Sequence, residues 1–168
     1  MSEFQDYKAR FDRNRALLQV PKDCTCRTPQ YRISSDFIDP QSWDFSWFLT
    51  FTDKHYICCN ESLSHRKGRP LQRHYFSFHY GPIVKIDSNG KIDRDQNNPL
   101  IIRIDRPGGV LMPAHLHYRK PHPFPDYKQA QIRGLTLLDA DMFQFVKAVF
   151  RARSEAIEIH VAMGFTYE

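Results

Sequence analysis

The sequence lacks any long hydrophobic run. Its longest apolar stretches, such as FLTF at 48–51, fall far short of the roughly 18 residues that a membrane-spanning helix needs. The opening residues, MSEFQDYKARFDRN, are charged throughout and lack the apolar centre of a secretory signal. We therefore expect a cytoplasmic protein without a membrane partner.

Cysteine is also scarce. The four cysteines occur as CTC (Cys24 and Cys26) and as CC (Cys58 and Cys59). Neither pair has the C-x2-C spacing of a zinc knuckle, and adjacent cysteines on a strand point to opposite faces. The sequence favours free thiols, as is usual in a reducing cytoplasm, over a site in which four thiolates bind zinc.

Several common catalytic motifs are missing as well. The chain contains no G-x-S-x-G, no P-loop, no Rossmann fingerprint and no H-E-x-x-H. The usual sequence evidence for a serine hydrolase, a P-loop nucleotidase, a dinucleotide-dependent enzyme or a zinc protease is therefore absent. Histidines and positively charged residues remain as the candidates for a catalytic or binding role.

What is present indicates one folded domain. The chain has 168 residues, of which 41% are hydrophobic and 14% aromatic, enough to bury a real core. We assign residues 1–168 to a single domain, with an N-terminal helix and connector over 1–42 and a core of sheet and helix over 43–168.

Hydrophobic spacing predicts two helices. The first begins near Ser2, ends before Pro21 and carries one apolar stripe, made by Phe4, Tyr7, Phe11 and Leu18. The second is DADMFQFVKAVFRARS at 139–154, which begins with aspartates and ends with arginines, as the helix dipole favours.

The remaining elements read as strands. WDFSWFLTF at 43–51 alternates apolar and other side chains and is the clearest strand in the sequence. Residues 21–42 read as an irregular connector with at most a short strand at QYRIS, and Asn89-Gly90 predicts a hairpin turn. Other strands are expected at HYICCNES, QRHYFSFHY, PLIIRID, AHLHYR and AIEIHVAMGF. The sum is an α+β fold, an antiparallel sheet of about five or six strands packed with an N-terminal and a C-terminal helix.

The positive charge is unevenly distributed. The net charge is +5 and the isoelectric point near 9.1. Residues 64–73 carry four cations and no acid, and residues 103–133 carry six cations against two acids. The two segments predict a polyanionic partner if the fold brings them together, and a solvated basic surface if it does not. The expected nucleic-acid contacts are Arg66, Lys67, Arg69, Arg73, Arg103 and Lys120.

The stretch MPAHLHYRKPHP at 112–123 concentrates imidazole and positive charge. If it is extended, His115, His117 and Arg119 share one face and the apolar residues between them share the other. Cleavage of RNA needs a base for the 2′-hydroxyl, an acid for the leaving oxygen and a cation beside the phosphorus. We assign His115 and His117 as base and acid and Arg119 as the stabilising cation, without a metal or other cofactor. A fourth member could come from a neighbouring strand or the next loop, as His79, Tyr80, Arg103 or His122.

The same histidines also suit a metal. Two histidines at i and i+2 on a strand are a familiar ligand pair, and His79, His122 or Asp105 could supply a third ligand. GVLMPAHLH matches the start of the first cupin motif, but no glutamate follows at the cupin spacing and a second motif is missing. A third alternative is that the histidines are structural or solvated.

The order of these segments resembles the TumE-like family of toxin–antitoxin toxins. The resemblance rests on RHYFSFHY, IIRID, PAHLHYR and DADMFQFVKAVFRAR, and covers roughly residues 44–153. It implies an intracellular protein that impairs growth until an antitoxin, commonly a helix-turn-helix protein, masks it, and it marks Asp105, His115 and His117 as functional. Arg106 departs from the asparagine that often follows the family's aspartate, and the first 40 or so residues are an addition.

Together these observations predict a small basic protein that acts on RNA or another phosphate-bearing substrate, as a metal-independent endoribonuclease toxin. The predicted catalytic residues are Asp105, His115, His117 and Arg119. Two alternatives stay open: a cupin-like metal enzyme that uses the same histidines, and a non-catalytic module that binds nucleic acid or a protein partner. The sequence also leaves open whether the chain forms a homo-oligomer.

Overall fold

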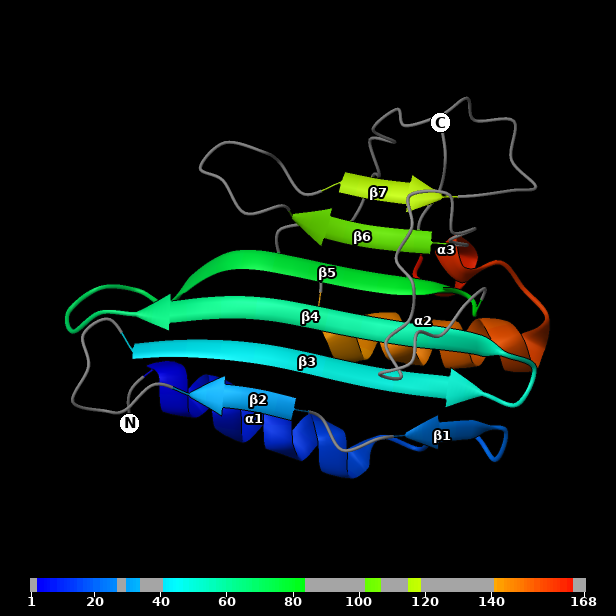
Figure 1. Ribbon diagram of the computed structural model, residues 1–168, viewed down its shortest axis with the longest axis horizontal. Coiled ribbons are helices and arrows are strands. Elements are labelled where there is room, and N and C mark those ends of the chain that lie inside the picture. Colours follow the sequence, from blue (N-terminus) through cyan, green and yellow to red (C-terminus); the bar gives the residue numbers. More distant parts are fainter. Residues whose placement is uncertain are drawn as a thin grey trace.

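The computed structural model describes residues 3–26, 30–33, 41–83, 102–106, 115–118 and 141–164. These residues form one sheet and three helices (Figure 1). The helices are α1 (Glu3–Leu17), α2 (Met142–Glu155) and α3 (Ile159–Ala162). The strands are β1 (Cys24–Cys26), β2 (Gln30–Ile33), β3 (Gln41–Phe51), β4 (His55–His65), β5 (Gln72–Pro82), β6 (Ile102–Arg106) and β7 (His115–Tyr118).

The sheet is antiparallel throughout its described part. Its strand order is β1-β3-β4-β5-β6-β7, and β2 also pairs with β3. β1 pairs with the end of β3 at 49–51, and β2 pairs with its start at 43–46, so the two short strands follow one another along the same edge. The predicted α+β fold, with its antiparallel sheet and its N-terminal and C-terminal helices, is confirmed.

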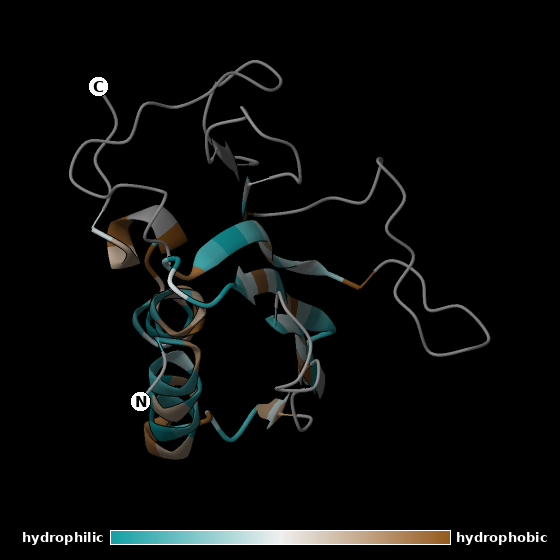
Figure 2. Ribbon diagram, turned by 90° about the vertical axis from the view of Figure 1, so that its left-hand side faces the viewer, coloured by the Kyte–Doolittle hydropathy of each residue, from teal (hydrophilic) through white to brown (hydrophobic). Residues whose placement is uncertain are grey.

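The core lies between the sheet and the two long helices, which cover the same face of the sheet (Figure 2). Alternate residues of β3 point into it and are at most 5% exposed: Trp43, Phe45, Trp47, Leu49 and Phe51. Phe11 of α1 packs edge-on against Trp43, Phe45 and Phe143, so one ring joins both helices to the sheet. We call the face of the sheet that points away from α1 and α2 the outer face.

The start and end of α2 follow the chemistry of its flanking residues. Asp141 is the N-cap, and its carboxylate accepts a 2.7 Å hydrogen bond from the backbone N–H of Phe143. Ala156 ends the helix with a φ of 52°, in the left-handed region. Within the described residues, no helix is both long and apolar enough to cross a membrane.

The prediction of a strand at AIEIHVAMGF is wrong, because the chain forms the short helix α3 there. The left-handed turn at Ala156 reverses the chain, and the backbone N–H of Ile157 donates back to the carbonyl of Ala152. Ile159 is buried in the core at the start of α3. The apolar spacing of this segment therefore reflects packing behind a helix end and not a strand face.

The connector prediction for 21–42 is only partly right. The short strand at QYRIS is confirmed as β2, but β1 at Cys24–Cys26 was not expected. Three residues are too few to show an alternation, and β1 exists because β3 offers it an edge. The predicted Asn89-Gly90 hairpin lies outside the described residues.

One arginine ties the last turn of α2 to three other elements. The guanidinium of Arg153 lies 2.9 Å from carboxylate oxygens of both Asp23 and Asp53, and donates to the Tyr80 hydroxyl at 2.9 Å. It also lies 3.9 Å from the centre of the Phe51 ring. Burial alone would raise the pKa of Asp53, but the hydrogen bond from Arg153 and the charge of His55 outweigh it and lower that pKa. This network holds the helix end, the chain before β1 and the β3–β4 turn together.

We predict that Arg153→Met destabilises the protein by about 2 kcal/mol, since it removes one cationic partner from each of two carboxylates and the donor to the buried Tyr80 hydroxyl. The free energy of unfolding in urea measures the effect. The control is Arg151→Ala, which breaks only the exposed 3.0 Å pair with Glu155 and is expected to cost less than about 0.5 kcal/mol. Equal effects of the two variants would contradict a special role for Arg153.

The same network predicts a pH dependence. A carboxyl group whose pKa is lowered by folding stabilises the protein above its unfolded pKa, and this contribution is lost as the pH falls through the folded value. The difference in unfolding free energy between wild type and Arg153→Met should therefore be constant from neutral pH to about pH 5 and shrink below about pH 4. A difference that stays constant through the acid range would show that Asp53 ionisation is not coupled to Arg153.

Candidate functional site

Strands β5, β6 and β7 bring polar residues together on the outer face. The register sets Ser77 opposite Asp105 and Asp105 opposite His115, and it sets His79 opposite Arg103 and Arg103 opposite His117. Residues opposite one another on antiparallel strands share a face. The result is two adjacent rows across three strands, Ser77–Asp105–His115 and His79–Arg103–His117, which we call the outer-face cluster.

Apolar residues on the core side specify this register. Phe76, Phe78 and Tyr80 of β5 and Ile102 and Ile104 of β6 are all buried in the core. A slip of one residue between the strands would turn every one of these side chains to the outer face and drive charged ones into the core. The polar rows are therefore placed by the apolar residues between them.

The described side chains of the cluster interact closely. Arg103 Nε lies 3.0 Å from a carboxylate oxygen of Asp105, and the Ser77 hydroxyl and His79 Nε2 are hydrogen-bonded. Ser77 is 2% exposed and Asp105 8% exposed. They are two of the three buried polar or charged residues in the described part of the chain, the third being Glu61. Burying such groups costs free energy unless they are paired, so their presence together indicates a built arrangement.

The predicted catalytic residues are partly brought together. Asp105 and His115 are neighbours across β6 and β7, and His117 lies beside Arg103, with strands spaced roughly 4.8 Å apart. Arg119, Lys120 and His122 lie outside the described residues.

The predicted basic contacts are divided between two places. Arg66, Lys67 and Arg69 are exposed in the turn between β4 and β5. Ser77 is five residues after Gln72, which lies at the edge of this turn, so it is roughly 17 Å further along the strand. The basic turn therefore lies at one end of the long hairpin, while Arg103 belongs to the cluster.

Arg73 does not join the basic turn. It lies opposite Leu63 in the sheet, and its guanidinium is 2.7 Å from a carboxylate oxygen of Glu61 and 4.1 Å from the centre of the Phe76 ring. Its described contacts are thus on the helix-covered side, and a role for it in nucleic-acid binding stays a prediction.

Sequence reasoning missed the buried acid on this side, Glu61. Its side chain is fully buried and accepts a hydrogen bond from the Tyr7 hydroxyl of α1. Burial raises the pKa of Glu61, although Arg73 and Tyr7 oppose the rise, and burial and the charge of Glu61 raise the pKa of Tyr7. The signal was available, since Glu61 lies between Cys59 and Leu63 in the alternation of β4.

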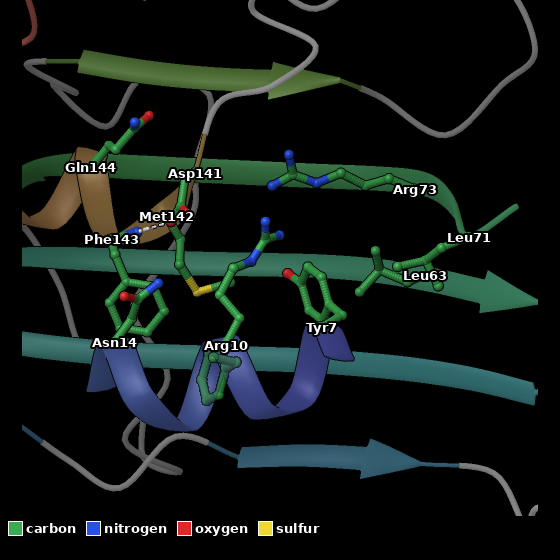
Figure 3. Close-up of a pocket in the computed structure, with 11 residues that line it drawn as sticks. Tyr7, Arg10, Asn14, Leu63, Leu71, Arg73, Asp141, Met142, Phe143 and Gln144 are labelled. Atoms are coloured by element: carbon green, nitrogen blue, oxygen red, sulfur yellow. Dashed lines mark hydrogen bonds between the residues drawn. The ribbon is translucent and has the colours of Figure 1, made fainter. Parts of the chain in front are cut away.

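A cavity of about 490 Å³ opens beside this acid, between α1, the start of α2 and strands β4 and β5 (Figure 3). Its lining mixes cations, amides, one carboxylate and apolar side chains. The lining residues are Tyr7, Arg10, Phe11, Asn14, Leu63, Leu71, Arg73, Asp141, Met142, Phe143 and Gln144.

None of the four cysteines, all of which lie within the described residues, forms a disulfide. Cys58 and Cys59 are both buried but belong to different apolar clusters, because they point to opposite faces of β4. Burial raises the pKa of Cys24 to about 11. In the part of the chain that the structure describes, no three histidine, cysteine or acidic side chains gather as a set of metal ligands.

Comparison with known proteins identifies no relative: no family model, no curated protein and no solved structure matches this chain.

Proposed function

We propose that this protein is a metal-independent endoribonuclease whose catalytic centre is the outer-face cluster. The observation that carries the proposal is the register of β6 and β7, in which Asp105 lies opposite His115 and Arg103 lies opposite His117. Two imidazole positions, a guanidinium and a carboxylate thus occupy neighbouring places on one face.

The chemistry requires each of these types. One histidine takes the proton of the 2′-hydroxyl, whose oxygen forms a bond to phosphorus. The other gives a proton to the 5′-oxygen as its bond to phosphorus breaks. An imidazole serves in either role near neutral pH, so His115 and His117 suit the base and acid roles. No redox partner or metal ion is needed to balance this step.

Arg103 and Asp105 support the histidines. A guanidinium offers paired N–H donors to phosphate oxygens, so Arg103 can offset the charge that develops at phosphorus, together with Arg119. The Asp105 carboxylate, 3.0 Å from Arg103 Nε, holds this guanidinium in place. Because Asp105 is also the register partner of His115, it can orient that imidazole and stabilise its protonated form.

The exposed basic turn gives the proposal a binding surface. Arg66, Lys67 and Arg69 carry three positive charges at the end of the β4–β5 hairpin, where backbone phosphates of a bound strand can reach them. We extend the proposal to a toxin that a partner antitoxin blocks, on the strength of the sequence resemblance alone.

The first prediction concerns cleavage of end-labelled RNA by the purified chain. Wild type should cleave in EDTA, and His115→Ala and His117→Ala should each slow cleavage at least about 100-fold, because each removes a proton-transfer group. Arg103→Gln should also slow cleavage by about 100-fold, with a smaller effect on RNA binding. The matched control is His74→Ala, which removes an exposed histidine from β5 outside the cluster and should leave the rate unchanged.

Two outcomes would contradict the proposal. If EDTA abolishes the activity and a divalent metal restores it, the two histidines are metal ligands and the metal-independent mechanism is wrong. Salt-sensitive RNA binding without any cleavage product would show that the protein is a non-catalytic module that binds RNA. Circular dichroism of each variant keeps a loss of folding distinct from a loss of chemistry.

A second prediction concerns the basic turn. Replacing Arg66, Lys67 and Arg69 together with glutamine should weaken RNA binding and lower the slope of log affinity against log salt by about 2, since each phosphate contact on a single strand contributes about 0.7. The rate at saturating RNA should not change. The control replaces Arg13 and Arg15, both exposed on α1, with glutamine. An equal loss in both variants would indicate a general charge effect with no local binding surface.

A further inference from the structure

The cavity between α1 and the start of α2 combines cations, aromatic side chains and one carboxylate, Asp141. Its volume of about 490 Å³ falls within the range of small-molecule sites. It lies on the helix-covered side of the sheet, whereas the outer-face cluster lies on the opposite side. A ligand in this cavity would therefore be separate from RNA bound at the outer face.

The wall of the cavity holds Arg73 in a defined place. The fully buried Glu61 lies 2.7 Å from the Arg73 guanidinium and accepts the hydrogen bond of Tyr7. The rings of Phe76 and Phe78 lie under the guanidinium, with centres 4.1 Å and 5.5 Å away. An arginine held by a carboxylate and two rings loses little freedom when it binds a ligand.

A second arginine faces the same space. Arg10 is exposed on α1, 5.4 Å from the centre of the Tyr7 ring, and none of the described carboxylates lies within ion-pair distance of it. Figure 3 shows the guanidinium groups of Arg10 and Arg73 both directed into the cavity. Two guanidiniums that share one space are best satisfied by an anion with several oxygens, which is the geometry of a phosphate.

The cavity lining also includes one carboxylate. Asp141 uses one oxygen to cap α2 through the Phe143 N–H, at 2.7 Å. A carboxylate has further acceptor sites and repels a second anion, so Asp141 favours a neutral hydrogen-bond donor. Phe143, which is 4% exposed, and the half-buried Tyr7 also line the cavity and add aromatic surface.

We propose that this cavity binds a nucleoside monophosphate whose base carries an amino group. The phosphate lies between Arg10 and Arg73, the base packs on Tyr7 and Phe143, and its amino group donates to Asp141. The geometry favours cytidine or adenosine monophosphate over uridine monophosphate, because a carboxylate accepts from an exocyclic amino group and repels a carbonyl oxygen in its place.

Titration calorimetry of the full chain with CMP, AMP, UMP and inorganic phosphate tests this site. We expect saturable binding of CMP or AMP at least about tenfold tighter than that of UMP or phosphate. Arg10→Ala should weaken the binding at least about tenfold, through loss of a charged hydrogen bond. Asp141→Asn keeps a good helix cap but removes the charge, and should abolish the preference over UMP.

The control is Arg13→Ala, an exposed arginine of α1 that does not line the cavity and should bind as wild type does. The proposal is overturned if no nucleotide binds, if phosphate alone binds as tightly as CMP, or if Arg10→Ala behaves as Arg13→Ala does. If His117→Ala loses nucleotide binding and Arg10→Ala does not, the nucleotide binds at the outer face, and the proposal is overturned as well. None of these readouts requires RNA cleavage, so failure of the ribonuclease proposal leaves this one independently testable.

Discussion

The two-residue alternation of the long strands is the constraint on which the rest of the structure depends. Every second side chain of β3, from Trp43 to Phe51, enters one core shared with α1 and α2. The same alternation continues through Phe78 of β5 and Ile104 of β6, both fully buried. Because this apolar face must stay dry, the register of each strand is set, and the residues between are directed to the outer face.

The charged residues closest to the core lie beside oppositely charged partners. On the outer face, Arg103 and Asp105 pair at 3.0 Å, and on the helix side Arg73 and Glu61 pair at 2.7 Å. The first pair lies next to the register positions of two histidines, and the arginine of the second lines a cavity. Pairing lets a small domain keep buried charge close to its core, since an isolated buried charge would cost far more free energy.

The elements that sequence predicted well are those whose evidence is local. The stripe on α1, the alternation of β3 and the aspartate and arginine ends of α2 each lie within one segment. The failures depend on contacts between segments. β1 is a strand because β3 lies beside it, and α3 replaces a strand because the helix end at Ala156 turns Ile157 and Ile159 toward the core.

The sequence by itself determined that His115 and His117 occur two residues apart and that positive charge gathers in two segments. Only the tertiary structure decided that Asp105 is the neighbour of His115 and Arg103 of His117, and that Arg73 turns inward to Glu61. Strand pairing and the shift in register between β4 and β5 at Ser62 and Leu63 involve residues distant in sequence, and no spacing within one segment reports which strands meet. Spacing within a segment shows which residues share a face of a strand or helix. Which strands and helices lie next to one another is decided by how all their apolar faces pack together.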